Sequence, residues 1–100
     1  MNTVSVSIDR YVLESLMADL VGHDRSPSAF LVYLALWARG GARRGAAVKI
    51  SHRELAEETG LSKSAVQSAI RRLTRRRLIT AARASRTATP EYSVLRPWRR

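Results

Sequence analysis

The spacing of apolar residues in the first forty positions predicts two helices. The first follows Asp9, which is expected to cap it, and carries apolar residues three or four apart as far as Val21. The second begins at Ser26-Pro27, with serine as the cap and proline in the first helical position. Every residue from Ala29 to Ala38 is apolar or aromatic, so we expect this helix to be central and buried on more than one side.

Two further helices are expected on either side of a turn at Gly60. Ser51 opens the first and forms a capping box with Glu54, three residues on. Ser62 caps the second, which has a narrow apolar stripe and a polar, basic opposite face. The stripe consists of Val66, Ala69, Ile70 and Leu73, and the opposite face of Ser64, Gln67, Ser68, Arg71 and Arg75.

Short strands are predicted where apolar and polar residues alternate or where β-branched residues follow a turn. These strands are residues 3–8, 46–50, 78–83 and 91–96. The last two form a hairpin whose connecting loop, 84–90, carries Arg86 at its tip. Residues 97–100 are expected to be a frayed basic tail, with packing of Trp98 against the body as the alternative.

Composition limits the possible functions. One hundred residues form one domain with a real core, and the lack of cysteine excludes disulfides and thiolate metal sites. Neither His23 nor His52 has a partner at ligand spacing, so we expect no metal and no cofactor. No secretory signal is visible, and the longest apolar run, of ten residues, is too short to cross a bilayer. The expectation is a soluble, cytoplasmic protein without a membrane partner.

The positive charge is concentrated towards the C-terminus. The net charge is −3 over residues 1–24, +3 over 25–60 and +10 over 61–100, a distribution typical of nucleic-acid binders. A solvated basic surface, common in arginine-rich proteomes, is the alternative. Sixteen of the eighteen basic residues are arginine, which favours bidentate contacts to phosphate or guanine but is also explained by codon bias.

The stretch SHRELAEETGLSKSAVQSAIRRLTRRR, residues 51–77, carries a family resemblance. The order helix, strand, helix, turn, helix, hairpin over residues 26–96 resembles the winged helix-turn-helix family of prokaryotic DNA-binding proteins. Ala56 is similar to the small residue of the family where the two helices cross, and Gly60 to its turn glycine. Leu61 and Val66 resemble the apolar residues that lock the helices together.

The resemblance implies a mainly α fold with a small β-hairpin: a winged helix-turn-helix preceded by an N-terminal strand and helix. It places helix 62–76 in the major groove of double-stranded DNA and the wing, 78–96, on the backbone or in the minor groove. The implied DNA-binding residues are Arg53, Ser62, Lys63, Ser64, Gln67, Ser68, Arg71, Arg72, Arg75, Arg83 and Arg86. An ordinary solvated helix face is the alternative for the polar residues, and helix-dipole or solubility roles are the alternative for residues 75–77.

The N-terminal segment leaves several interpretations open. Residues 1–25 form an extension to domain 26–96, and 97–100 form the tail. The segment also resembles ribbon-helix-helix repressors, in which Thr3, Ser5 and Ser7 would face DNA, but its net charge is negative. It therefore serves for dimerisation, contacts DNA, or only completes the core.

The leading hypothesis is a sequence-specific transcriptional regulator, a homodimer on a palindromic site. The alternatives are a replication-initiator or plasmid-maintenance protein, and a protein-interaction winged helix, which requires an exposed apolar patch on the recognition helix. An enzyme is not expected, because paired carboxylates, an activated nucleophile and a phosphate-binding glycine loop are missing. The residues identify no small-molecule effector, and ligand control would require a pocket between the N-terminal and central helices.

Overall fold

The computed structural model describes residues 4–99 and contains four helical segments and a three-stranded sheet. The N-terminal helix covers residues 10–23 and includes two π-helical stretches, η1 and η2. Helix α1 continues into a π-helical turn, η3. The bounds are η1 Val12–Leu16, η2 Asp19–His23, α1 Pro27–Leu36, η3 Trp37–Gly41, β1 Val48–Lys49, α2 His52–Thr59, α3 Lys63–Arg75, β2 Ile79–Ala82 and β3 Glu91–Val94.

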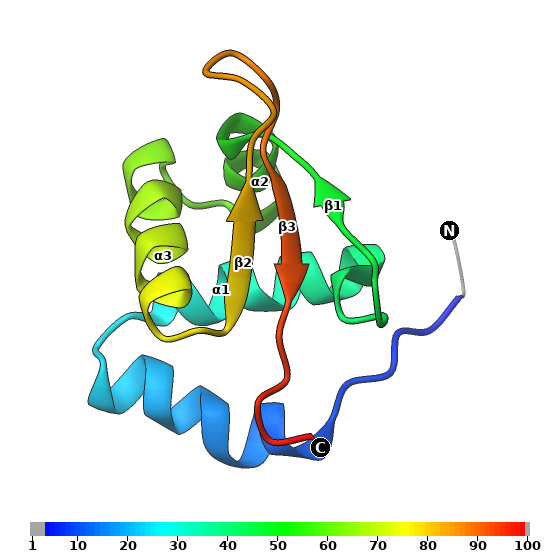
Figure 1. The fold of residues 1–100 in the computed structure, drawn as a ribbon. Helices are drawn as coiled ribbons and strands as arrows, with labels where there is room; N and C mark the ends of the chain where they lie inside the picture. The colour runs from blue at the N-terminus through cyan, green and yellow to red at the C-terminus, as the bar shows by residue number, and fades with distance from the viewer. Residues whose placement is uncertain (1–3, 100) are drawn as a thin grey trace.

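Helix α1 lies at the centre of the molecule (Figure 1), between the N-terminal helix on one side and the α2–α3 pair and the sheet on the other. It packs against η2, α2, α3 and β3. Its buried residues are Ala29, Phe30, Val32, Tyr33 and Leu36. The expectation of a central helix buried on more than one side is confirmed.

The sheet is antiparallel, with the strand order β1-β3-β2. Val48 and Lys49 pair with Tyr92 and Glu91, while β2 pairs along the full length of β3. The predicted strands at 46–50, 78–83 and 91–96 therefore form, each with shorter bounds than the sequence pattern suggested.

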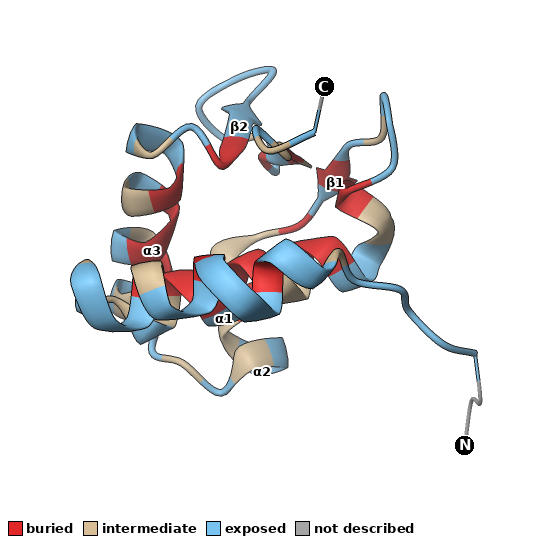
Figure 2. Ribbon diagram, turned by 90° about the horizontal axis from the view of Figure 1, so that it is seen from below, coloured by how far each residue is buried: buried red, intermediate tan, exposed pale blue. Residues whose placement is uncertain are grey.

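The N-terminal helix contributes to the common core. Val12, Leu16 and Leu20 are buried in the same cluster as the residues of α1 and α3, as the burial colours of Figure 2 illustrate. The four stripe residues of α3 are also buried, as their spacing predicted. Residues 10–23 thus complete the core. In the described part of the chain, no helix combines the length and hydropathy that a membrane span needs.

The N-terminal arm, residues 4–9, forms no strand, which corrects the prediction for residues 4–8; Thr3 lies outside the described residues. The arm contacts the body through Ser7, whose carbonyl oxygen accepts from Trp37 Nε1 at 2.7 Å, and through Asp9, which accepts from the C-terminal segment. Val4 is 79% exposed. A strand needs a hydrogen-bonding neighbour, and among the described residues no strand pairs with the arm.

The C-terminal segment packs against the start of the N-terminal helix. The prediction of a frayed tail is therefore wrong for residues 97–99, and the prediction that Trp98 packs against the body is confirmed. The Trp98 ring stacks on Tyr11 with ring centroids 4.6 Å apart, and its Nε1 donates to Asp9 Oδ2 at 2.9 Å. Arg99 binds the same carboxylate, at 2.6 Å. The Asp9 carboxylate binds Trp98 and Arg99 and does not cap the helix, which corrects the prediction of a cap at Asp9. The hydrogen bond from Arg99 lowers the pKa of Asp9.

Glycine is required for different reasons at two turns. A Cβ on the buried Gly41 would lie 2.8 Å from the Leu36 carbonyl oxygen and 3.0 Å from a Val48 methyl group, so only glycine fits. Gly60 ends α2 with φ +78°, in the left-handed region, as predicted for the turn.

Two glycines provide a matched test of backbone conformation. Gly60 and Gly22 both have open space where a Cβ would stand, but only Gly60 has a positive φ. We expect Gly60→Ala to lower the free energy of unfolding by about 1 kcal/mol. Gly22→Ala, within η2, should raise it by about 0.5–1 kcal/mol. Urea unfolding followed by circular dichroism would measure both, and shifts of the same sign would contradict this assignment.

Candidate nucleic-acid interface

The α2–turn–α3 unit is built by local capping signals in the sequence. Ser51 Oγ accepts from the Glu54 backbone N–H at 3.1 Å while the Glu54 carboxylate accepts from the Ser51 N–H at 3.2 Å, completing the predicted capping box. The hydrogen bonds that the Ser51 N–H and the Ser51 hydroxyl donate to the Glu54 carboxylate lower the pKa of Glu54. Ser62 caps α3 by accepting from the Ala65 N–H at 3.1 Å. The first turns of both helices therefore have fixed backbone N–H groups, which suit phosphate oxygens.

Helix α3 presents its polar face to solvent, with its apolar stripe held in the core. Lys63, Ser64, Ser68, Arg71 and Arg75 are exposed, as is the cap Ser62, and Gln67 is half-buried. Arg71 Nη2 donates to Ser68 Oγ at 3.2 Å, one helical turn away. The face therefore offers guanidinium, ammonium, amide and hydroxyl groups at adjacent positions, the groups that contact base edges and phosphates.

The wing loop, residues 83–90, extends beyond the ends of β2 and β3 (Figure 1). Arg83 and Arg86 are exposed on it, and Arg83 Nη1 donates to the Arg86 carbonyl oxygen at 3.3 Å. Between Thr59 and Pro90 the sequence contains no acidic residue. The basic residues on the surface formed by α3 and the wing loop therefore come from a segment of the chain that contains no acidic residue.

Two arginines at the C-terminal end of α3, Arg72 and Arg76, lie against the acidic end of the N-terminal helix, and the assignment of Arg72 as a DNA contact stays a prediction. Arg76 binds Asp19 and Asp24 of the N-terminal helix region, with Nη1 3.1 Å from Asp24 Oδ1. Arg72 Nη1 lies 3.8 Å from Asp24 Oδ2. Arg72 follows Arg71 by one residue, and the 100° step of a helix carries it from the outer face to the side that meets the N-terminal helix.

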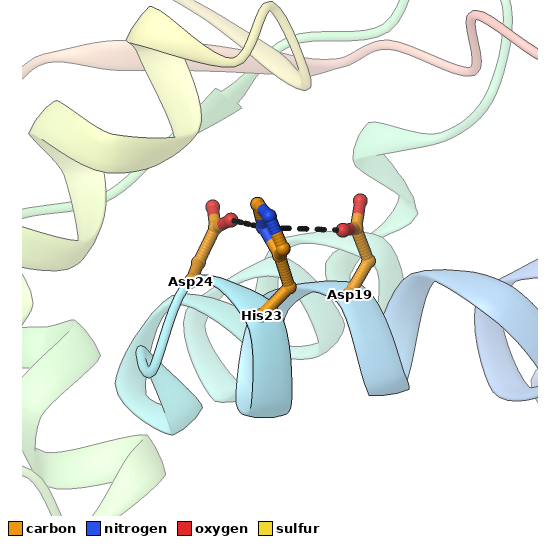
Figure 3. Close-up of side chains that lie close together, drawn as sticks. All are labelled: Asp19, His23 and Asp24. Carbon is orange, nitrogen blue, oxygen red and sulfur yellow. Dashed lines mark hydrogen bonds and ion pairs between the residues drawn. The ribbon is translucent and has the colours of Figure 1, made fainter.

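Asp19, His23 and Asp24 form a polar cluster at the end of the N-terminal helix (Figure 3). Their candidate ligand atoms lie within 4.8 Å of one another, an arrangement compatible with a metal ion. However, the Arg76 guanidinium binds both carboxylates and opposes a second cation there. Hydrogen bonding by His23, together with Arg76 and Arg72, lowers the pKa of Asp24, whose side chain is only 4% exposed. We interpret the cluster as the attachment of α3 to the N-terminal helix.

Arg53 is 84% exposed on α2 and lies 3.3 Å from Glu57, four residues on. Exposed pairs of this kind contribute little to stability and exchange readily. Its assignment as a DNA contact remains a prediction.

A contact between His52 and Tyr92 joins α2 to the wing and was not predicted. His52 Nε2 lies 3.1 Å from the Tyr92 hydroxyl. The residues are forty positions apart, and no spacing in the sequence indicates their proximity. Partial burial, with Arg83 and Lys63 nearby, lowers the pKa of His52. Burial also raises the pKa of Tyr92. Near neutral pH the pair is therefore uncharged and positions the wing beside α2.

Comparison with known proteins adds a family and a fold. The model of a family described as a helix-turn-helix domain matches residues 26–79. Among solved structures, the crystal structure of the AntR antimony-specific transcriptional repressor is similar, with a TM-score of 0.52 and 20% identity, covering 94% of this chain and 84% of that one. At this identity the likeness shows a shared fold. No curated protein matches the chain.

The His52–Tyr92 contact predicts a pH dependence of stability. Because the pKa of His52 is lower in the folded protein than the ordinary value of 6.5, the unfolded chain binds its proton first as the pH falls. The free energy of unfolding should therefore decrease as the pH drops below about 6.5. Unfolding by urea between pH 7.5 and 5 would measure the slope.

His52→Gln should reduce this slope. His23→Gln, which removes the other, exposed histidine, is the matched control and should retain it. Equal slopes in the wild type and His52→Gln would show that His52 does not cause the effect.

Proposed function

We propose that this chain, which belongs to the helix-turn-helix domain family of DNA-binding transcriptional regulators, binds a specific double-stranded site with α3 in the major groove. The wing loop then lies on the backbone or in the adjacent minor groove. In a prokaryotic cell such a protein works at the nucleoid, in the cytoplasm. The observation that carries the proposal is that α3 buries one complete stripe and exposes a polar, basic face free of carboxylates.

Some residues on the exposed face of α3 suit contacts to bases, and others suit contacts to phosphates. Arg71, in mid-helix, can donate to guanine O6 and N7, and its hydrogen bond to Ser68 limits the conformations of the guanidinium. Gln67 suits adenine. Lys63, Arg83 and the N–H groups at the helix starts suit phosphate oxygens, which fix the position of the protein on the duplex.

The competing protein-interaction hypothesis has less support. It requires an apolar patch on the outer face of α3, but every exposed large hydrophobic residue of the described chain lies between Val4 and Leu31. We also infer that the chain acts by binding alone and not as an enzyme, since the family and fold are those of DNA-binding regulators. A role in replication initiation or plasmid maintenance would use the same DNA contacts.

We infer that the protein is a homodimer that pairs through the N-terminal helix. Leu13, Met17 and Val21, four residues apart, form an exposed apolar row on its outer side, and their exposed fractions are 51%, 43% and 39%. Leu31 of α1 is also exposed. The row is symmetric about Met17, so two antiparallel copies would bring Leu13 of each opposite Val21 of the other, as a twofold interface requires. Such a dimer would present two α3 helices to a palindromic site.

Arg71→Ala should weaken binding to a site selected from random DNA by about 1–3 kcal/mol if the guanidinium contacts a base. Fluorescence anisotropy on the selected duplex, and on duplexes substituted at single positions, would measure the loss. Specificity should relax at one position of each half-site, because one base contact is removed.

Arg86→Ala is the comparison variant for Arg71→Ala. Arg86→Ala should weaken binding by less than Arg71→Ala does, and by a similar amount on every DNA sequence. It should also flatten the salt dependence of binding, because it removes a phosphate contact. Equal affinities of Arg71→Ala and the wild type for the selected site would refute the assignment of α3 as the recognition helix.

The dimer is tested by Met17→Glu, which places two charges at the centre of the twofold interface. We expect the mass in solution to fall from that of a dimer to that of a monomer, measured by light scattering after size exclusion. Ala18→Glu adds the same charge to another exposed side of the same helix and should leave the dimer intact. A monomeric wild type, or equal behaviour of the two variants, would exclude this interface.

A further inference from the structure

A second cationic site lies where the N-terminal arm and the C-terminal segment meet the body of the protein. We call it the arginine hollow: about 490 Å³ in volume, lined by the N-terminal arm, η3 with Ala42, and the four arginines Arg43, Arg44, Arg96 and Arg99. An adjoining hollow of about 360 Å³ shares these four arginines. The volume is within the range of small-molecule sites, and none of these residues belongs to α3 or the wing loop.

The charge of the arginine hollow is largely unbalanced. Asp9 is its one lining carboxylate against four arginines, which leaves a net charge of +3. Arg99 is paired with Asp9. Within residues 4–99, Arg43, Arg44 and Arg96 make no ion pair, and the Arg96 guanidinium lies 5.9 Å from the centroid of the Trp37 ring. Cations gathered in a concave site concentrate the field and attract anions.

The sheet topology separates the arginine hollow from the proposed DNA surface. The wing loop joins the end of β2 to the start of β3, whereas β1 runs antiparallel to β3, so the residues before Val48 lie towards the far end of β3, where Ser93 Oγ donates to the Ala46 carbonyl oxygen at 2.9 Å. The loop 42–47 therefore lies at the end of the sheet opposite the wing loop, as Figure 1 shows. A duplex seated on α3 and the wing loop would leave the hollow open.

We propose that the arginine hollow binds a small organic anion with two or more phosphate groups. Guanidinium groups bind phosphate oxygens in a bidentate manner, and three unpaired arginines match a charge greater than that of one phosphate. The apolar wall of Val6, Ala38 and Ala42 provides a surface for the organic part of the ligand. This proposal goes beyond DNA binding and does not depend on it.

A bound polyphosphate would also connect the N-terminal arm to the body. Trp37 already holds Ser7, and Arg99 holds Asp9, and these contacts of the arm border the hollow. An anion across Arg43 and Arg96 would bridge the loop 42–47 and the C-terminal segment, which holds the arm through the Arg99–Asp9 ion pair. Because the ligand binds the folded state, it should raise the unfolding temperature.

Isothermal titration calorimetry with ADP tests the proposal, with adenosine as the uncharged comparison. The double variant Arg43→Ala/Arg44→Ala should weaken ADP binding about tenfold or more. Arg83→Ala/Arg86→Ala is the matched control: it also removes two exposed loop arginines and the same charge, and it should leave the ADP affinity within about twofold of wild type. Circular dichroism would establish that both variants remain folded.

Three results would overturn the proposal. The first is the absence of ADP binding to the wild type. The second is equal weakening by both double variants, which would indicate general attraction of anions to a basic protein. The third is loss of DNA affinity in Arg43→Ala/Arg44→Ala together with displacement of ADP by a short duplex, which would make the hollow a DNA contact. Failure of the wild type to bind any DNA would affect only the proposed function.

Discussion

The structure depends on the burial of α1. A helix that is apolar around its whole circumference is stable only where other elements cover most of its surface, and of its large apolar residues only Leu31 stays exposed. The N-terminal helix covers one side, and α2, α3 and the sheet cover the rest. Tyr33 links this core to the C-terminal segment, since its hydroxyl donates to the Leu95 carbonyl oxygen at 2.8 Å, and burial raises the pKa of that hydroxyl. The position of α3 on the surface follows from this packing.

The basic residues divide by the direction in which the fold turns them. Arg76 binds the acidic end of the N-terminal helix and contributes to attachment, whereas Arg71 remains in solvent on the adjacent face. Arg43 and Arg44 lie on a loop at the opposite end of the sheet from the wing. The basic residues of the chain thus have three different locations: an internal contact, the proposed DNA surface and the arginine hollow.

The N-terminal segment combines core and surface in one helix. Its inner residues, such as Leu16, are buried against the body, and its outer row, centred on Met17, remains exposed. A second copy that covers this row would use a helix already held in place by the Asp24–Arg76 pair and by Trp98. The geometry of a dimer would then be rigidly connected to the position of α3, which is what recognition of a spaced palindrome requires.

Local signals in the sequence determined the elements that depend on near neighbours. The capping box at Ser51, the turn at Gly60 and the buried stripe of α3 were predicted because each rests on residues within a few positions of one another. The same periodicity identified the outward face of α3, and with it most of the candidate DNA-contacting residues.

Only the tertiary structure decided the long-range contacts, because sequence spacing carries no information about distant partners. The arm forms no strand, His52 contacts Tyr92, and Arg72 and Arg76 lie against Asp24. The arginine hollow arose in the same way, because folding brings the N-terminal arm, the loop 42–47 and the C-terminal segment together beside η3.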